Sequence, residues 1–207
     1  MSKPKLYGIS SSRAFRSIWA AQELGLDYEH VPTSFRGDAQ QPEYLAVNPN
    51  GRIPALQDGD FKLFESMAIN MYLAKKTGSN LLPDDLMGES LTWQWSVWAI
   101  SEIEPLQMQI VIQKFFVPPE RRDEAVVERA GKGLARPLQV LDAHLGQQVY
   151  LLGDHFSLAD LNLAGVMDLL AMVEFDLSSW PNVETWLTNC RARPSYASAK
   201  RVGVDSE

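Results

Sequence analysis

The sequence predicts an α/β domain followed by an all-helical domain. Short apolar runs alternate with helical patterns over the first third of the chain, and helical patterns then continue almost without interruption. With 207 residues, of which 45% are hydrophobic, the chain is long enough for two small domains that each bury a core. We therefore expect domains at 1–78 and 89–207, joined by a turn-rich linker at 79–88.

Residues 1–78 carry strand and helix signals in the order β-α-β-α-β-β-α. Asp58-Gly59 between two short apolar runs is a strong hairpin signal, and Gly25 and Gly78 are favoured residues just after a helix. We expect the first two strands to be parallel and the last two to form the hairpin. The predicted elements are a strand at 5–9, a helix at 16–25, a strand at 28–35, a short helix at 42–49, a hairpin at 54–65 and a helix from residue 66 to Gly78.

The remainder of the chain is predicted to be helical. A tryptophan-rich helix begins near residue 89, and a proline-containing break follows at 116–123. Ser157 and Asp160 form a capping-box pattern just ahead of an apolar run, and the last predicted helix, at 181–194, stops before Pro194. One helix face is marked by four leucines at i, i+4, i+7 and i+11: Leu134, Leu138, Leu141 and Leu145.

Composition narrows the classes of function. A net charge of −7 and a pI near 5.0 argue against nucleic acid or an anionic membrane as the main partner, because both require a basic surface. The single cysteine, Cys190, forms no internal disulfide and is interpreted as a small buried hydrophobe. The three histidines show no metal-ligand spacing. There is no signal-peptide pattern and no run of 18 apolar residues, so we expect a cytoplasmic protein.

Three consecutive serines follow the first predicted strand, in the segment YGISSSRAFR at 7–16. A helix that begins near Arg13 would put Ser12 at or next to the N-cap, where its oxygen accepts a hydrogen bond from a backbone N–H two or three residues on. That structural role explains Ser12 without any ligand. The same geometry also suits an anion, because exposed N–H groups and the helix dipole attract negative charge and the hydroxyl donates to it.

Two further turns carry candidate site residues. Ile53-Pro54 directly precedes a strand, and the residues alone favour a trans bond, since only about 5–6% of such bonds are cis. A cis bond would instead turn the backbone groups of Ile53 toward a cleft, where an extended peptide binds well. At the next strand-to-helix turn, Ser66 is a candidate N-cap. Alternatively, Glu65 and this helix N-terminus hold the amino and carboxylate groups of an amino acid.

Four ordered segments resemble those of a known family: SRAFRSIW at 12–19, NPNGRIPAL at 48–56, FESMAINMYLA at 64–74 and FSLADLNL at 156–163. Together they resemble the cytosolic glutathione transferases, specifically serine-type members of a bacterial-like or theta-like branch. The resemblance covers nearly the whole chain. It implies a thioredoxin-like N-terminal domain, an all-helical C-terminal domain, a homodimer, a role in detoxification, and glutathione as cosubstrate with no bound cofactor.

The resemblance also implies roles for individual residues. Ser12 would occupy the position of the serine whose hydroxyl donates to the glutathione sulfur. Ile53 would present its backbone to the cysteinyl part of glutathione beside a cis Pro54. Glu65 and Ser66 would hold the γ-glutamyl end of the tripeptide.

Several assignments stay open at this point. Ser10 and Ser11 are alternatives to Ser12 if the turn shifts register, and Tyr7 is the nearest match to the tyrosine of other family members, although it lies within the predicted strand. The glycyl carboxylate has no assigned partner. The candidates for that role are Arg36, Gln40, Gln41 and Arg52.

The expected reaction is attack by the glutathione thiolate on a small hydrophobic electrophile or a peroxide. Ser12 and the N-terminus of the first helix would stabilise the thiolate, which a free thiol with a pKa of about 8.5 scarcely forms at neutral pH. Two alternative functions are a non-catalytic binding or regulatory module on the same fold and a glutathione-dependent disulfide reductase. The absence of cysteine near residue 12 disfavours the reductase.

Overall fold

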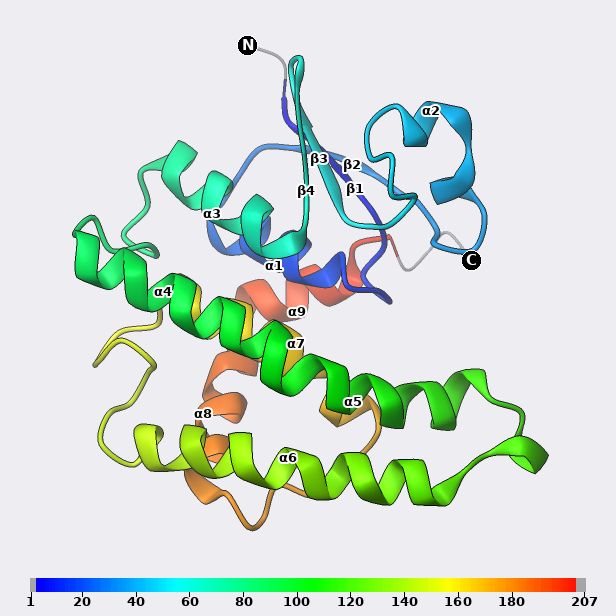
Figure 1. Ribbon diagram of the computed structural model, residues 1–207. Coiled ribbons are helices and arrows are strands. Elements are labelled where there is room, and N and C mark those ends of the chain that lie inside the picture. Colours follow the sequence, from blue (N-terminus) through cyan, green and yellow to red (C-terminus); the bar gives the residue numbers. More distant parts are fainter. Residues whose placement is uncertain (1–2, 204–207) are drawn as a thin grey trace. The chain divides into compact units, whose positions relative to one another are not determined.

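The computed structural model describes residues 3–203, which form two compact units (Figure 1). The first unit comprises the described residues through Pro83 together with those from Arg191 onward. Up to Pro83 its elements follow the predicted order. They are β1 (Lys5–Tyr7), α1 (Phe15–Glu23), β2 (Glu29–Val31), the 3-10 turn η1 (Asp38–Gln40), α2 (Pro42–Leu45), β3 (Ala55–Asp58), β4 (Phe61–Phe64) and α3 (Ser66–Thr77).

The sheet of the first unit has the strand order β2-β1-β3-β4. β1 and β2 are parallel, whereas β3 is antiparallel to both β1 and β4. Gly59 adopts a φ of 62° in the turn between β3 and β4, a conformation that costs glycine little. The predicted parallel pair and the predicted Asp58-Gly59 hairpin are therefore confirmed. Because α1 directly follows β1, the serine turn lies at the carboxyl end of a central strand.

The second unit, Asp84–Cys190, is helical. The predicted leucine face is confirmed, since all four leucines are buried in α6. A continuous helical segment contains two π-helical turns, η2 and η3, which the sequence pattern did not predict. The elements are α4 (Leu86–Trp98), η2 (Ala99–Ile103), α5 (Glu104–Val111), η3 (Ile112–Phe116), the 3-10 turn η4 (Pro119–Arg121), α6 (Glu124–Leu145), α7 (Leu158–Met172) and α8 (Pro181–Arg191).

The predicted capping box at the start of α7 is present and belongs to a larger network. Asp160 is fully buried, and its carboxylate accepts hydrogen bonds from the Ser157 N–H at 2.9 Å and the Ser157 hydroxyl at 2.6 Å. It also accepts from the Leu151 N–H and the Trp186 Nε1–H, both at 2.8 Å. One carboxylate therefore joins the loop before α7, the first turn of α7 and α8.

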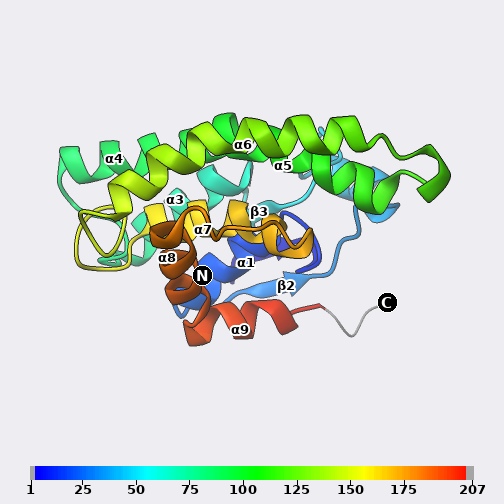
Figure 2. The same ribbon diagram turned by 90° about the horizontal axis from the view of Figure 1, so that it is seen from below.

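The C-terminal residues differ from the prediction. The domain predicted at 89–207 includes them, but from Arg191 onward they belong to the first compact unit. Pro194 ends the predicted helix and also begins a further one, α9 (Pro194–Arg201), because proline is well accommodated at the first helical position. α9 lies along α1 (Figure 2), where Tyr196 contacts both Phe15 and Trp19 at ring-centroid distances of 5.3 Å.

An ion pair also ties α9 to α1. The guanidinium of Arg193 donates two hydrogen bonds to the carboxylate of Glu23, which also accepts from the Ser195 hydroxyl. Burial raises the pKa of Glu23, but the bonds from Arg193 and Ser195 and the Arg193 charge outweigh burial, so the pKa lies below its ordinary value.

This pKa shift predicts an acid-sensitive contact between α1 and α9. A carboxyl group with a lowered folded-state pKa stabilises the fold above its unfolded pKa of about 4.3 and loses that contribution as the pH falls through the folded value. We expect the unfolding free energy of the wild type to decline below about pH 4 more steeply than that of Glu23→Gln. Urea unfolding at pH 3 to 7 measures this, and equal slopes for the two proteins would contradict it.

Candidate active site

The serine turn between β1 and α1 holds Ser12 half-buried. Its Oγ accepts a hydrogen bond from the Ala14 N–H at 3.1 Å and donates to the Ile9 carbonyl at 2.7 Å. The predicted acceptance from an N–H two residues on is thus confirmed. The helix itself starts later than expected, at Phe15, with Ala14 rather than Ser12 or Arg13 at the N-cap. Ser12 consequently stands just ahead of the N-terminus of α1.

The three alternatives to Ser12, namely Ser10, Ser11 and Tyr7, differ in burial and in hydrogen bonding. Ser10 is buried, and its hydroxyl donates to the Ala199 carbonyl at 2.8 Å. Ser11 is exposed, and its side chain forms no hydrogen bond within residues 3–203. The hydroxyl of Tyr7 donates to the Gln57 Oε1 at 3.0 Å. Ser12 is the residue of this group whose hydroxyl lies next to the first turn of α1.

The Ile53-Pro54 bond is cis. The trans bond favoured by the residues alone is therefore wrong, and the cis bond implied by the family resemblance is confirmed. A proline's bond isomer depends on surrounding tertiary contacts that a local sequence does not reveal. Among the described residues, neither the N–H nor the C=O of Ile53 has a hydrogen-bond partner, which leaves both groups available to an extended peptide.

The backbone next to Ile53 is held by buried side chains. The Arg52 carbonyl accepts hydrogen bonds from the Tyr44 hydroxyl at 2.5 Å and from the Asn48 Nδ2 at 2.6 Å. Burial, together with the neighbouring Tyr7, raises the pKa of Tyr44 to about 12, although the bond with Asn48 opposes the shift. Tyr44 therefore keeps its proton and remains a donor at neutral pH.

Glu65 and Ser66 form the turn from β4 into α3. Glu65 adopts a φ of 72° and a ψ of 116°, a conformation that non-glycine residues rarely occupy and that is concentrated at functional sites. It holds the N-cap position that the sequence suggested for Ser66, which instead is the first helical residue and is buried. The exposed carboxylate of Glu65 has no partner within the described part of the chain.

The start of α3 offers unpaired donors. The Glu65 carbonyl accepts from the Ile69 N–H at 2.9 Å, but within residues 3–203 the preceding N–H groups of Ser66, Met67 and Ala68 have no acceptor. These groups, the Ser66 hydroxyl and the Glu65 carboxylate form one cluster with donors for a carboxylate and an acceptor for an ammonium group.

The four candidate partners of the glycyl carboxylate differ in whether their side chains already contact other residues of the chain. Gln40 donates to the Gly51 carbonyl at 2.9 Å, and the Arg36 guanidinium lies over the Phe35 ring at 5.5 Å. The side chains of Gln41 and Arg52 are exposed and form no hydrogen bond or ion pair among the described residues. Gln40 is therefore already engaged, whereas Arg36, Gln41 and Arg52 keep side-chain donors that can meet a carboxylate.

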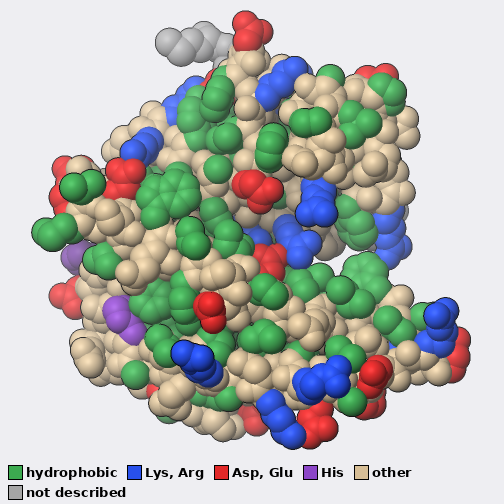
Figure 3. Space-filling model, viewed as in Figure 1, with side chains coloured by type: hydrophobic (Ala, Val, Ile, Leu, Met, Phe, Trp, Pro, Cys, Tyr) green, Lys and Arg blue, Asp and Glu red, His purple; other side chains and the backbone are tan. Residues whose placement is uncertain are grey.

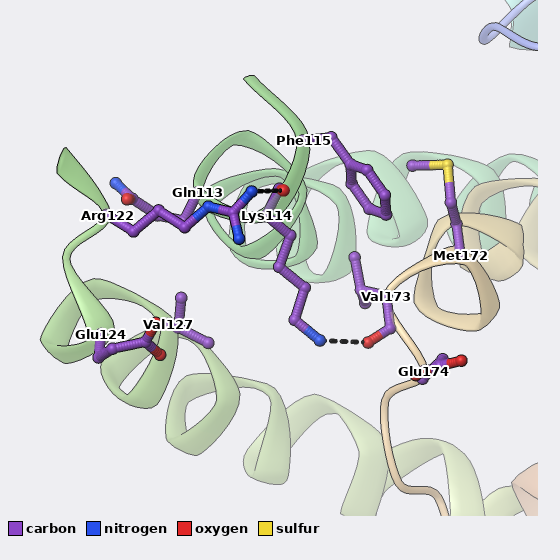
Figure 4. Close-up of a pocket in the computed structure, with 9 residues that line it drawn as sticks. All are labelled: Gln113, Lys114, Phe115, Arg122, Glu124, Val127, Met172, Val173 and Glu174. Carbon is purple, nitrogen blue, oxygen red and sulfur yellow. Dashed lines mark hydrogen bonds between the residues drawn. The ribbon is translucent and has the colours of Figure 1, made fainter. Parts of the chain in front are cut away.

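A cavity of about 450 Å³ lies within the second unit, and no sequence motif indicated it (Figure 4). Apolar side chains, two cationic side chains, two carboxylates and one amide line it. The Lys114 Nζ donates to the Val173 carbonyl at 2.6 Å, and the Arg122 Nη2 donates to the Lys114 carbonyl at 2.6 Å. The lining residues are Gln113, Lys114, Phe115, Arg122, Glu124, Val127, Met172, Val173 and Glu174. The lining residues come from η3, the segment that leads into α6, the start of α6, and the end of α7, which is far from the other three in sequence.

Neither a metal centre nor a membrane span is found among the described residues. No group of three or more His, Cys, Asp or Glu side chains there is placed to hold a metal ion. No helix over the same part of the chain is both long and apolar enough to cross a membrane.

Comparisons with known proteins match two segments of the chain to one family. Residues 2–75 match the family model of the glutathione S-transferase N-terminal domain, and residues 103–194 match that of the C-terminal domain. A probable glutathione S-transferase, GSTF2, from Oryza sativa subsp. japonica is 38% identical over 94% of both chains.

Solved structures are similar over almost the same length. Glutathione S-transferase-I, bound with lactoylglutathione, is 34% identical with a TM-score of 0.87 over 96% of this chain and 99% of its own. A family member from Pseudomonas fluorescens with two glutathiones bound is 30% identical, with a TM-score of 0.88 over 96% of this chain and 92% of its own.

Proposed function

The chain belongs to the glutathione S-transferase family and is a glutathione transferase, and from this premise we propose that Ser12 activates the thiol of bound glutathione. The observation that supports this proposal is the position of the half-buried Ser12 hydroxyl, just ahead of the N-terminus of α1. The thiolate then attacks a small hydrophobic electrophile or a peroxide. With a carbon electrophile the sulfur forms a C–S bond while the bond from that carbon to its leaving group breaks, and the leaving group takes the electron pair. With a peroxide the sulfur bonds to one oxygen as the O–O bond breaks, the other oxygen leaves as an alcohol after taking a proton from solvent, and a second glutathione converts the sulfenic acid to disulfide and water. In both cases the thiol proton is lost to solvent when the thiolate forms.

The activation follows from hydrogen bonding and the helix dipole. A free thiol has a pKa of about 8.5, and each unit by which it is lowered corresponds to about 1.4 kcal/mol of thiolate stabilisation. The Ser12 hydroxyl donates to the Ile9 carbonyl at 2.7 Å. Rotation of the hydroxyl toward the sulfur would replace that bond with a charge-assisted one, which is roughly twice as strong as a neutral bond.

The rest of glutathione fits the unpaired groups of the first unit. Its α-ammonium group pairs with the Glu65 carboxylate, and its α-carboxylate accepts from Ser66 and the first N–H groups of α3. The unpaired backbone of Ile53 beside cis Pro54 binds the cysteinyl part. Arg52 and Gln41 meet the glycyl carboxylate.

Glu65→Gln tests the glutathione site. The substitution keeps the shape of the side chain but removes the charge that pairs with the ligand's ammonium group. We expect the Kd for reduced glutathione to rise about ten- to a hundred-fold, the equivalent of one charge-assisted hydrogen bond. Isothermal titration calorimetry measures this.

Asp60→Asn is the matched control, because Asp60 is an exposed acid in the β3–β4 turn with no partner among the described residues. It should leave the Kd unchanged. An equal loss of affinity in both variants would indicate a general charge effect, and an unchanged Kd in Glu65→Gln would remove Glu65 from the site.

We further propose that the enzyme is a homodimer that uses the outer face of α4. Exposed apolar side chains concentrate on this helix and the π turn after it, and hydrophobic side chains gather over this region in Figure 3. Patches of this kind on a stable protein usually mark an interface. The exposed residues are Leu86, Met87, Leu91, Trp93, Val97 and Ile100.

Val97→Asp should shift the protein from dimer to monomer in sedimentation velocity, because it places a charge within an apolar interface. Val97 is 52% exposed, and Val149, outside α4, is 53% exposed. Val149→Asp is therefore the matched control and should remain dimeric. A monomeric wild type, or a dimeric Val97→Asp, would contradict the proposed interface.

A further inference from the structure

Ser10 links the serine turn to the end of the described chain. It is 6% exposed, and its Oγ lies 2.8 Å from the Ala199 carbonyl and within hydrogen-bond distance of the Val202 carbonyl. A serine hydroxyl has one proton, so it donates to one of these oxygens at a time. Ala199 lies in the last turn of α9 and Val202 directly follows the helix, and both belong to the same unit as β1 and α1.

Ser10 also directly follows Ile9, whose carbonyl oxygen orients the Ser12 hydroxyl. The Ile9 carbonyl accepts from the Ser12 N–H at 3.2 Å and from the Ser12 hydroxyl at 2.7 Å. The turn has little room to adjust, since a Cβ added to Gly8 would lie 2.3 Å from the Cβ of Ala14. A backbone shift at Ser10 would therefore move the Ile9 carbonyl and change the direction of the Ser12 hydroxyl.

The C-terminal helix is a fixed anchor for Ser10. Tyr196 packs against the rings of Phe15 and Trp19, and the Trp19 Nε1–H donates to the Ser195 hydroxyl at 3.0 Å. These contacts hold α9 on α1 independently of Ser10. The position of the Ala199 carbonyl is thus determined by α1 itself, the helix whose N-terminus faces the thiolate.

We propose that Ser10 is a positioning residue for the transferase reaction, through which α9 holds the Ser12 hydroxyl in the direction of the glutathione sulfur. The inference rests on the proposed role of Ser12. Ser10 does not touch the substrate in this arrangement, and it acts through the turn. The C-terminal helix thereby contributes to thiolate formation although it lies about 190 residues from Ser12 in sequence.

The test compares Ser10→Ala with Ser11→Ala. Ser11 is exposed in the same turn and forms no side-chain hydrogen bond within residues 3–203, so it is a matched control. We expect Ser10→Ala to raise the pKa of the bound glutathione thiol by about half a unit to one unit, which lowers the thiolate fraction about three- to ten-fold below that pKa. Ser11→Ala should leave it unchanged. Ultraviolet absorbance of the thiolate across pH measures this value.

Binding of S-methylglutathione separates positioning from loss of the site. This ligand has no thiol to ionise, so its Kd should be nearly the same in the wild type and Ser10→Ala. The other charged groups near the turn are the same in each protein: Arg13 in the turn, His30, whose Nε2 lies 2.8 Å from the Gly8 carbonyl, and Lys200 over the Phe15 ring at 4.2 Å. These groups are therefore no source of a difference between the wild type and Ser10→Ala.

The possible results distinguish a failure of the Ser10 proposal from a failure of the proposed glutathione site. An unchanged thiol pKa in Ser10→Ala would overturn the positioning role while leaving the transferase function and Ser12 intact. A wild type that fails to bind glutathione would overturn the proposed site together with this inference. Should Ser10→Ala fail to fold, Ser10→Cys keeps a similar shape with a weaker donor. In that variant a raised thiol pKa supports the proposal, and an unchanged one overturns it.

Discussion

Ser12→Ala is expected to lower kcat/KM about ten- to a hundred-fold with any electrophile whose reaction is limited by thiolate attack. The variant removes one hydrogen bond to a charged group, which is worth about 1.5–3 kcal/mol. The thiol pKa of bound glutathione should rise by about one to two units in parallel. Steady-state kinetics as a function of pH, with thiolate absorbance on the same samples, measures both quantities.

The loss should fall on chemistry rather than on binding. The groups of Glu65, Ser66 and Ile53 that we propose to bind glutathione are left in place by the substitution, so the Kd for glutathione should change by less than about three-fold. The N-terminus of α1 also remains, and the variant should retain part of the activity. Wild-type turnover and an unchanged pH profile in Ser12→Ala would show that Ser12 is not the activating residue.

Ser12→Thr separates the hydroxyl from the turn it stabilises. Ser12 Oγ bridges the Ile9 carbonyl and the Ala14 N–H, so alanine also removes a local structural contact. Threonine retains a hydroxyl for both contacts and for the sulfur. Recovery of the thiol pKa in Ser12→Thr would assign the effect to the hydroxyl. A thermal unfolding midpoint that falls in Ser12→Ala with no change in thiol pKa would assign Ser12 a purely structural role.

The parts of the fold that the sequence predicts are those determined by local contacts. Asp58-Gly59 specifies the hairpin because both its strands and its turn lie within a few residues. The leucine spacing specifies the buried face of α6, and Ser157 with Asp160 specifies the start of α7, for the same reason. Each signal involves neighbours along the chain, so no knowledge of the tertiary structure is needed.

What the sequence does not predict depends on distant contacts. Ser10 resembles its neighbours in sequence, yet its hydroxyl binds a carbonyl 189 positions away, and no local pattern distinguishes it from Ser11. The cis bond before Pro54 and the positive φ of Glu65 likewise depend on the packed environment of each turn. The sequence therefore identifies the turns that carry the candidate site residues, but it does not identify the distant groups that orient them.

Asp160→Ala is expected to destabilise the protein by more than about 3 kcal/mol. It leaves the N–H groups of Leu151 and Ser157, the Ser157 hydroxyl and the Trp186 indole N–H without their acceptor in a fully buried site. Each buried donor left unpaired costs about 1–3 kcal/mol, partly offset by relaxation and entry of water. Urea unfolding followed by far-ultraviolet circular dichroism measures the loss.

Asp85→Ala is the matched control for this prediction. Asp85 is also an acidic cap, but it is exposed and accepts a single bond, from the Gly88 N–H at 2.9 Å at the start of α4. Loss of such a cap costs about 1 kcal/mol. If burial and the number of donors determine the effect, Asp160→Ala must exceed Asp85→Ala several-fold. Equal losses would mean that Asp160 acts only as a helix cap, and that Leu151 and Trp186 are held in place by apolar packing rather than by the carboxylate.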